Sequence, residues 1–460
     1  MAFSTRLTPL RHRTDFSVSG LLNSDSVTSI ALTSTGYPAA ATVVGSPYTV
    51  TPSAALGTGL GNYTISYFNG TLTVNKAHLT VTADAKSVQY SDPLPTLTAT
   101  ISGFVNGETD AGLRMSGDLS GQPSFSTSAT ITFYSTTGVS NAPGTYTDAI
   151  IPSLGTLSAA NYDFPAGNFV KGTLNVNQED ARAYYTGSLF VDTSGPNSNT
   201  ATVTLSATIK DITAVTGDPA YDAYPGDIRH ATVTFINRDS NTVIASNLPV
   251  GLVNNNDTTV GAVTYNWNVT LTSPPSQSYR IGIIVNNYYT DNISSEDTVV
   301  TVSVPPASGQ ITGGGYLVMQ NSAGQYAGAV GTKNNFGFNV QNAHNGLHGN
   351  INTIIRNNGH TYQVKGNSMT SLTTHATTLP YTATFNGKAS LQDITDPLHP
   401  ISIDGNATLQ VTMTDRGEPG SSDSIGITVW AHAGGLYFSS NWNGTTTVEQ
   451  TLGGGNVQVH

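Results

Sequence analysis

The stretch Asn62-Tyr-Thr-Ile-Ser-Tyr-Phe-Asn-Gly-Thr-Leu-Thr-Val-Asn75 holds two short motifs that return about a hundred residues later. Asn-Tyr recurs at Asn161-Tyr162, and Gly-Thr-Leu-x-Val-Asn recurs at Gly172-Thr-Leu-Asn-Val-Asn177, in the same order and with a similar gap. A repeat of this length is typical of one β-sandwich domain, whereas a solenoid repeat spans only about 20–50 residues. The sequence therefore predicts a tandem array of β-sandwich domains.

The composition also favours an all-β fold. Charged residues make up 10% of the 460 residues, whereas a typical globular protein has about 25%. Thr, Ser, Asn and Gly occupy the polar positions instead, and 47 glycines and 22 prolines interrupt the chain. Uncharged β-branched residues suit exposed strand faces, and no stretch has sustained helical periodicity, so we expect many short strands joined by turns.

Charge and cysteine content exclude several classes of protein. Only 17 Lys and Arg occur and the net charge is −11, so the chain lacks the basic surface of a nucleic-acid-binding protein. It has no cysteine, which excludes disulfide scaffolds, thiolate metal sites and cysteine nucleophiles. A low-charge, cysteine-free, Thr- and Asn-rich chain indicates an exported bacterial protein, located outside the cell or on its surface.

The N-terminus does not explain export. Residues 1–15 are basic and remain unassigned, because they lack the apolar segment of a signal peptide. No run of about 18 apolar residues occurs, so we expect no membrane-spanning helix. Either export is signalled elsewhere, or the chain is the C-terminal part of a longer polypeptide, which is the interpretation we favour.

The two repeats differ in length. Residues 78–178 form a complete repeat that opens with the alternating stretch Ala77–Asp84, whereas residues 16–77 lack any counterpart of the opening strands at 77–101. The first sandwich is therefore predicted to miss its front edge. One explanation is a fragment or a misplaced start codon. The other is completion by a strand from another molecule, which would give a self-associating fibre.

Residues 16–178 resemble the MBG repeats of large bacterial surface proteins. Five motifs carry the resemblance: Tyr90-x-Asp-Pro-x-Pro95, Ser102-Gly-Phe-x-Asn-Gly107, Gly144-Thr-Tyr146, Asn161-Tyr162 and Gly172-Thr-Leu-x-Val176. Family members often have Gly where Ser91 stands. The resemblance implies immunoglobulin-like sandwiches in an extracellular stalk or adhesin, and it implies no catalytic activity.

Two further β domains are predicted. Residues 179–306 contain five strand-like runs separated by turns, as in another immunoglobulin-like sandwich, with Trp267 as its core anchor. Residues 307–460 open with Gly313-Gly-Gly315 and end near Gly453-Gly-Gly455, and form a C-terminal β-rich sandwich domain. This last domain resembles the post-COAP-1 module of secreted bacterial proteins in Gly313-Gly-Gly-Tyr316, Asn335-Phe-Gly-Phe338, Asp415-Arg-Gly-Glu-Pro-Gly420 and Gly454-Gly-Asn456.

Two acidic loops are candidate calcium sites, because calcium takes six to eight oxygen ligands and clustered carboxylates supply them. The first loop holds Asp218, Asp222 and Asp227, and the second holds Asp415, Glu418 and Asp423. The alternative is that these carboxylates cap turns, since Gly-Glu-Pro-Gly is itself a good hairpin turn. We expect no other cofactor.

Aromatic residues near the C-terminus suggest a glycan-binding site. Tyr437, Asn441, Trp442 and Asn443 combine rings that stack on sugars with amides that bond their hydroxyls. The alternative is that these aromatics pack in the core.

No catalytic motif occurs, so we expect no enzyme. The leading hypothesis is a structural, adhesive stalk of stacked sandwiches whose partners are glycans or proteins of a cell surface or matrix. The first alternative is a carbohydrate-binding surface protein acting through the C-terminal domain. The second is a subunit of an extracellular fibre formed by strand addition. A polysaccharide hydrolase would need two carboxylates about 5–10 Å apart in a cleft.

Overall fold

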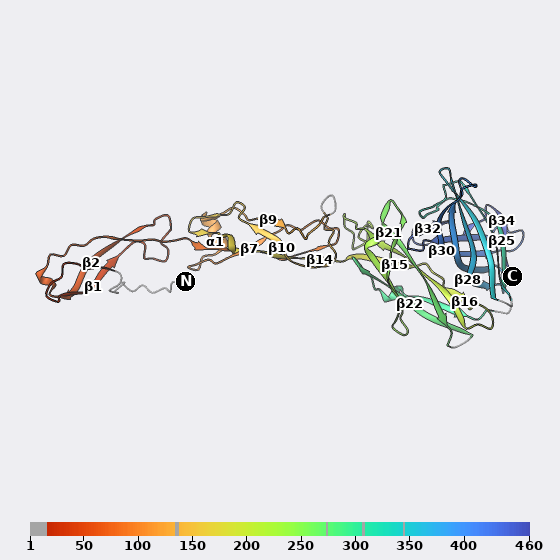
Figure 1. The fold of residues 1–460 in the computed structure, drawn as a ribbon, viewed down its shortest axis with the longest axis horizontal. Helices are drawn as coiled ribbons and strands as arrows, with labels where there is room; N and C mark the ends of the chain where they lie inside the picture. The colour runs from red at the N-terminus through yellow and green to blue at the C-terminus, as the bar shows by residue number, and fades with distance from the viewer. Residues whose placement is uncertain (1–15, 134–137, 273–274, 306–308, 344–345) are drawn as a thin grey trace. The chain divides into compact units, whose positions relative to one another are not determined.

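The computed structural model describes residues 16–133, 138–272, 275–305, 309–343 and 346–460, so the basic leader at 1–15 lies outside the described residues. Strands make up 56% of the chain and helices 4%, which confirms the all-β prediction (Figure 1). Within the described residues, no helix is both long and apolar enough to cross a membrane.

The chain divides into two compact units. The N-terminal unit comprises Met1–Val88, Leu94–Thr132 and Gly144–Asn175, and the C-terminal unit comprises Gln89–Pro93, Phe133–Pro143 and Val176–His460. The turn Gln89–Pro93 therefore belongs to the C-terminal unit, although it lies within the second repeat in the sequence. The predicted domain boundaries at 179 and 307 stay predictions.

The first repeat is a single three-stranded antiparallel sheet of β1 (Ser26–Thr33), β2 (Tyr48–Thr58) and β3 (Gly70–Leu72). Val27 is the one buried hydrophobic side chain among its described residues, and Phe68 is 84% exposed. Leu72 and Val74, which would face a second sheet in a complete sandwich, are half-buried. The repeat therefore has almost no core, as its missing strands predict.

The second repeat has two layers. One sheet has the order β6-β14-β10-β9 and the other β13-β5-β7. Their strands are β5 (Thr80–Ala83), β6 (Lys86–Gln89), β7 (Ala99–Ser102), β9 (Ser124–Thr127), β10 (Gly144–Ser153), β13 (Phe169–Val170) and β14 (Gly172–Asn177). The pairs β4 (Ala77–His78) with β12 (Tyr162–Asp163) and β8 (Leu119–Ser120) with β11 (Ser158–Ala159) complete it. The opening strands absent from the first repeat supply core residues such as Leu79 and Val81 here.

One short helix interrupts this repeat. Helix α1 (Asp110–Ser116) begins at Thr109, whose side chain accepts a hydrogen bond from the Gly112 N–H, and ends at Gly117 in the left-handed conformation. Ser or Thr at the start and Gly at the end satisfy the backbone groups that a helix leaves unpaired. Leu113 is its only buried residue, so α1 adds little to the core.

Two five-stranded sheets follow, with the orders β20-β21-β17-β15-β23 and β16-β24-β22-β18-β19. Their strands are β15 (Glu179–Tyr185), β16 (Phe190–Asp192), β17 (Thr200–Asp211), β18 (Ala231–Asn237), β19 (Thr242–Pro249), β20 (Gly251–Asn254), β21 (Asp257–Thr270), β22 (Ser276–Asn287), β23 (Tyr289–Thr290) and β24 (Thr298–Ser303). Leu205, Phe235 and Ile281 are fully buried. Trp267 is half-buried and packs edge-to-face on Tyr279, with ring centroids 5.1 Å apart.

The remaining strands form one curled antiparallel sheet in the order β32-β31-β30-β29-β28-β27-β26-β25-β34 (Figure 1). They are β25 (Gly309–Val318), β26 (Lys333–Ala343), β27 (Gly346–Asn357), β28 (His360–His375), β29 (Tyr381–Asp393), β30 (Ile401–Asp415), β31 (Ser424–Trp430), β32 (Leu436–Ser439), β33 (Gln450–Thr451) and β34 (Gly454–Val459). Its strands share one hydrophobic core that includes Phe385 and Phe438.

The last strands connect distant parts of this sheet, because β33 pairs with β31 and β34 pairs with β25. One glycine from each of the two triplets noted in the sequence meets the other there, because Gly315 is paired to Gly455. A Cβ on Gly315 would lie 2.3 Å from the carbonyl oxygen of Gly454, so only glycine permits this approach.

Candidate metal-binding site

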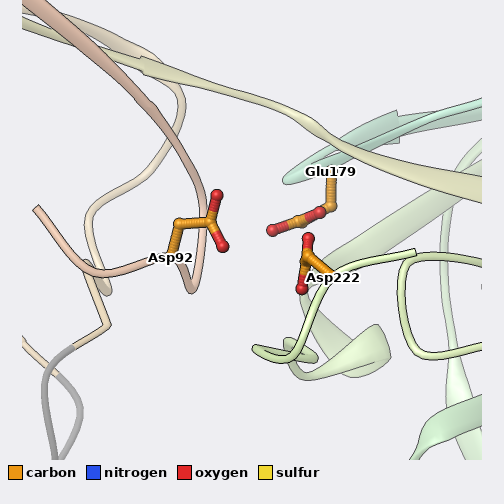
Figure 2. Close-up of side chains that lie close together, drawn as sticks. All are labelled: Asp92, Glu179 and Asp222. Carbon is orange, nitrogen blue, oxygen red and sulfur yellow. The ribbon is translucent and has the colours of Figure 1, made fainter. Parts of the chain in front are cut away.

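Three carboxylates from distant parts of the sequence meet in the C-terminal unit (Figure 2). Asp92 comes from the turn Gln89–Pro93, Glu179 is the first residue of β15, and Asp222 lies in the loop between β17 and the short helix η3 (Ile228–His230). One oxygen of each lies within 4.8 Å of one oxygen of each other carboxylate. Among the described residues, this is the one group of three acidic, His or Cys side chains with such spacing.

The turn is held by backbone and aromatic contacts. The N–H groups of Tyr90 and Ser91 donate to the carbonyls of Asn177 and Val139. The Tyr90 ring is fully buried and packs edge-to-face on Tyr289, with centroids 5.9 Å apart. These contacts fix the direction in which Asp92 leaves the turn.

Ser91 has φ +72°, a left-handed conformation that favours glycine. Its hydroxyl lies 3.0 Å from Glu179 Oε1 and 2.5 Å from the carbonyl oxygen of Tyr224. The hydroxyl has one proton and both neighbours are acceptors, so it donates to only one of them at a time.

Glu179 is fully buried. Strand β15 alternates buried and half-buried positions, and Glu179 lies on the same buried face as Ala181 and Ala183. Its Oε2 has no hydrogen-bond partner among the described residues. Burial, followed by the negative charges of Asp211, Asp222 and Asp92, raises the pKa of Glu179 to about 9, although the Ser91 hydroxyl acts in the opposite direction.

Asp92 and Asp222 are partly exposed and form the open side of the cluster. Asp92 Oδ1 is a buried oxygen without a partner among the described residues. Burial and then the charge of Asp222 raise the pKa of Asp92 to about 6. Asp222 Oδ1 accepts a hydrogen bond from the Tyr224 N–H at 2.7 Å.

The arrangement suits a hard cation better than catalysis. Three clustered carboxylates, of which Asp92 and Glu179 each have a buried oxygen without a partner among the described residues, supply oxygen ligands of the kind that calcium and magnesium bind. A polysaccharide cannot reach Glu179, because its side chain is fully buried.

The structure separates the carboxylates of the first predicted loop. Asp218 Oδ1 accepts a hydrogen bond from the Ala220 N–H, and Asp227 forms an ion pair with Arg229 at 2.5 Å. Only Asp222 of this loop joins the cluster. Asp92 and Glu179 were not predicted from the sequence. Glu179 alternates with Ala181 and Ala183 along β15, and this pattern could have indicated that its carboxylate lies on the buried face of the strand.

The carboxylates of the second predicted loop bind the last strand. Asp415 Oδ2 and Asp423 Oδ2 accept hydrogen bonds from the backbone N–H groups of Val459 and Val457, at 3.0 and 3.2 Å. Glu418 Oε1 accepts from the side-chain amides of Asn456 and Gln458. A calcium ion here stays a prediction, and the visible contacts serve the pairing of β34.

The predicted glycan residues lie in two different environments. Trp442 packs against the hydrophobic cluster of Val253, Ala262, Trp430 and Leu436, whereas Tyr437 packs against the core of the curled sheet. Asn443 Oδ1 accepts hydrogen bonds from the N–H groups of Thr445 and Thr446, as in a turn. Asn441 is half-buried, and glycan binding by these four residues stays a prediction.

Sequence comparison finds a family match over both repeats. Residues 12–73 and 79–175 match the family model of the MBG domain (YGX type). The first MBG match is the shorter of the two, in agreement with the missing layer of the first sheet. Ser91 stands where MBG domains often carry Gly, and its positive φ explains that preference. The MBG matches do not include residues 307–460, so the post-COAP-1 resemblance stays a prediction. No curated protein matched the chain.

Proposed function

We propose that the chain is a non-catalytic structural part of an extracellular bacterial surface protein, in which tandem β domains form an adhesive stalk. The observation that carries this proposal is the pair of MBG matches, because MBG domains occur in bacterial surface proteins. The uncharged polar composition and the absence of cysteine support the same role.

Labelling of intact cells tests this proposal. Antibodies raised against the second MBG repeat should label intact cells of the bacterium that produces the protein, and external protease should remove the signal. Labelling only after permeabilisation would contradict an extracellular stalk. A cytoplasmic marker protein, which external protease should leave intact, serves as the control for cell integrity.

Carbohydrate binding through the C-terminal domain is a second candidate function. A pocket of about 400 Å³ lies beside β28, β29 and β30, and its polar lining includes Thr384 and Gln410. Phe190 is 53% exposed at this pocket and packs edge-to-face on His375 at 5.8 Å. An exposed ring beside hydroxyl and amide groups is the usual combination for sugar stacking and hydrogen bonding.

A glycan array separates this function from a passive stalk. Binding that is lost in Phe190→Ala and kept in Trp442→Ala would place the site in this pocket, and the reverse would place it at Trp442. The absence of any bound glycan would remove this candidate and leave the stalk proposal unaffected.

Fibre formation is the third candidate function, and the first repeat favours it. Among the described residues, its sheet has two open edges, β1 and β3, and one face without a covering layer, so an added strand would gain backbone hydrogen bonds and apolar contacts. Size-exclusion chromatography with light scattering should then show growth in mass with concentration, and a chain that begins at Ala77 should remain monomeric. Constant monomeric mass for both would contradict strand addition.

A further inference from the structure

The cluster of Asp92, Glu179 and Asp222 is unbalanced in charge. The charges that act on Glu179 are those of Asp211, Asp222 and Asp92, all of them negative. The arginines on neighbouring elements pair elsewhere: Arg182 lies 3.5 Å from Glu296, and Arg229 pairs with Asp227. A buried carboxylate without a cation or a donor is costly, because desolvation penalises its charged form.

A second observation, the environment of Glu179, does not depend on the distances between the three carboxylates. Glu179 is fully buried, and its Oε2 has no partner among the described residues. Figure 2 shows its carboxylate directed toward those of Asp92 and Asp222. Buried polar oxygens in folded proteins nearly always have a partner, so this oxygen points to a ligand that satisfies it.

We propose that Asp92, Glu179 and Asp222 bind one calcium ion. The cation joins the turn Gln89–Pro93, the start of β15 and the loop after β17, which the chain brings together from three distant stretches. This site goes beyond the proposed function and does not depend on it, since the ion would bind whether or not the protein is a stalk.

The donor set selects the ion by its chemistry. All three side chains are carboxylates and the chain has no cysteine, so zinc, which prefers nitrogen and sulfur, is disfavoured. Calcium accepts irregular sets of six to eight oxygens, whereas magnesium requires near-octahedral geometry and keeps most of its water. Ligands from three separate segments suit the tolerant geometry of calcium. The partly exposed Asp92 and Asp222 provide its route of entry.

The alternative to a bound calcium ion is a proton on the Glu179 carboxylate. If Ser91 donates to the Tyr224 carbonyl oxygen, a protonated Glu179 could donate to Ser91 and relieve the repulsion without any metal. The two explanations differ for Glu179→Gln. An amide replaces a protonated carboxyl well, but it removes a charged calcium ligand.

The test uses the full chain, stripped with a chelator and then titrated with calcium in a calorimeter. One ion should bind with a dissociation constant on the order of 10⁻⁴ M, as in extracellular calcium modules. Calcium at about 100 times this constant should raise the melting temperature of the C-terminal unit by about 5 °C, and equal magnesium should raise it less. Glu179→Gln and Asp222→Asn should each weaken calcium binding at least tenfold.

The matched control is Asp180→Asn, which removes the same charge one position along β15, on the opposite face of the strand. It should bind calcium as the unchanged chain does. No heat of binding at millimolar calcium, together with a Glu179→Gln variant at least as stable as the chelated parent chain, would overturn the proposal in favour of the proton. Unchanged binding in both Glu179→Gln and Asp92→Asn would also overturn it, because the ion would then lie elsewhere. Should Glu179→Gln fail to fold, Asp92→Asn and Asp222→Asn decide the question.

Discussion

Asp415 Oδ2 accepts a hydrogen bond from the backbone N–H of Val459 at 3.0 Å. The neighbouring His460 N–H donates in the other direction, to the carbonyl of Gln310 in β25. The N–H groups on one side of β34 thus pair with β25, and those of Val459 and Val457 on the other side are satisfied by Asp415 and Asp423. Two carboxylates replace the neighbouring strand that β34 lacks on that side.

Asp415→Ala should lower the free energy of unfolding of the C-terminal unit by about 1–3 kcal/mol, because it leaves the buried Val459 N–H without an acceptor. Chemical denaturation monitored by Trp fluorescence measures the change. Glu418→Gln is the control from the same loop. Its side chain is exposed and the amide oxygen can still accept from Gln458, so the change should stay below about 0.5 kcal/mol. Equal effects of the two substitutions would contradict this account.

Gly315→Ala should destabilise the curled sheet by about 1–3 kcal/mol, because the new Cβ would lie 2.3 Å from the Gly454 carbonyl oxygen and would push β34 away. Gly314→Ala is the matched control. Its Cβ would find its nearest neighbour, the Phe336 carbonyl oxygen, at 3.8 Å, an ordinary contact. Thermal unfolding of both variants checks the difference, and similar melting temperatures would show that β34 adjusts freely.

The stability of the chelated C-terminal unit should fall as pH rises. Burial and neighbouring carboxylates raise the pKa of Glu179 from 4.5 to about 9 and that of Asp92 from 3.8 to about 6. Between its unfolded-state and folded-state pKa values, each group binds more protons in the folded state than in the unfolded state. The stabilisation that this protonation provides is present at low pH, and it is lost as the pH rises through about 6 for Asp92 and about 9 for Glu179. The slope should reach about 1.4 kcal/mol per pH unit for each group.

Urea denaturation at a series of pH values, with chelator and with saturating calcium, tests this dependence. Calcium should remove most of the decline, since it stabilises the ionised carboxylates. The titratable groups that interact with Glu179 are Asp92, Asp211, Asp222 and Tyr289. A flat profile in chelator would mean that Glu179 is not buried as a carboxylic acid.

The first MBG repeat should open more readily than the second. Val27 is its one buried hydrophobic side chain among the described residues, whereas the second repeat buries Leu79, Val81 and Leu174 completely. Hydrogen exchange of a dilute sample should therefore be faster at residues 26–72 than at β5 and β14. Equal protection at high protein concentration that disappears on dilution would instead indicate that another copy covers the sheet.

The all-β fold could be predicted because its signals are local. Alternation in Ala77–Asp84 and the repeated Gly-Thr-Leu motifs each describe a strand with one buried face, and the structure has strands there. Local signals also failed in places. Residues 129–133 are rich in β-forming residues, but the nearby strand is β9 at Ser124–Thr127, and the Ile131 N–H closes a turn onto Ser128. Helix α1 was not predicted, although Thr109 and Gly117 mark its ends.

The acidic cluster could not be predicted, because its members are separated by 87 and 43 residues in the sequence and only the packing of three segments joins them. The second acidic loop illustrates the same limit. Its composition suggested an ion, but the partner that its carboxylates visibly bind is strand β34, whose position depends on the order of all the strands of the curled sheet.

That strand order also affects how the domain reaches its folded state. Strand β25 is made first and its partner β34 last, so the pairing of Ile311 with Val459 closes a loop of almost the entire domain. Contacts so distant in sequence form slowly, because the entropy of loop closure must be overcome before they contribute. During synthesis, which proceeds from the N-terminal end, one edge of β25 stays unpaired until residues 454–459 have emerged. The interval before closure is when this domain is most vulnerable to proteases and to pairing with other chains.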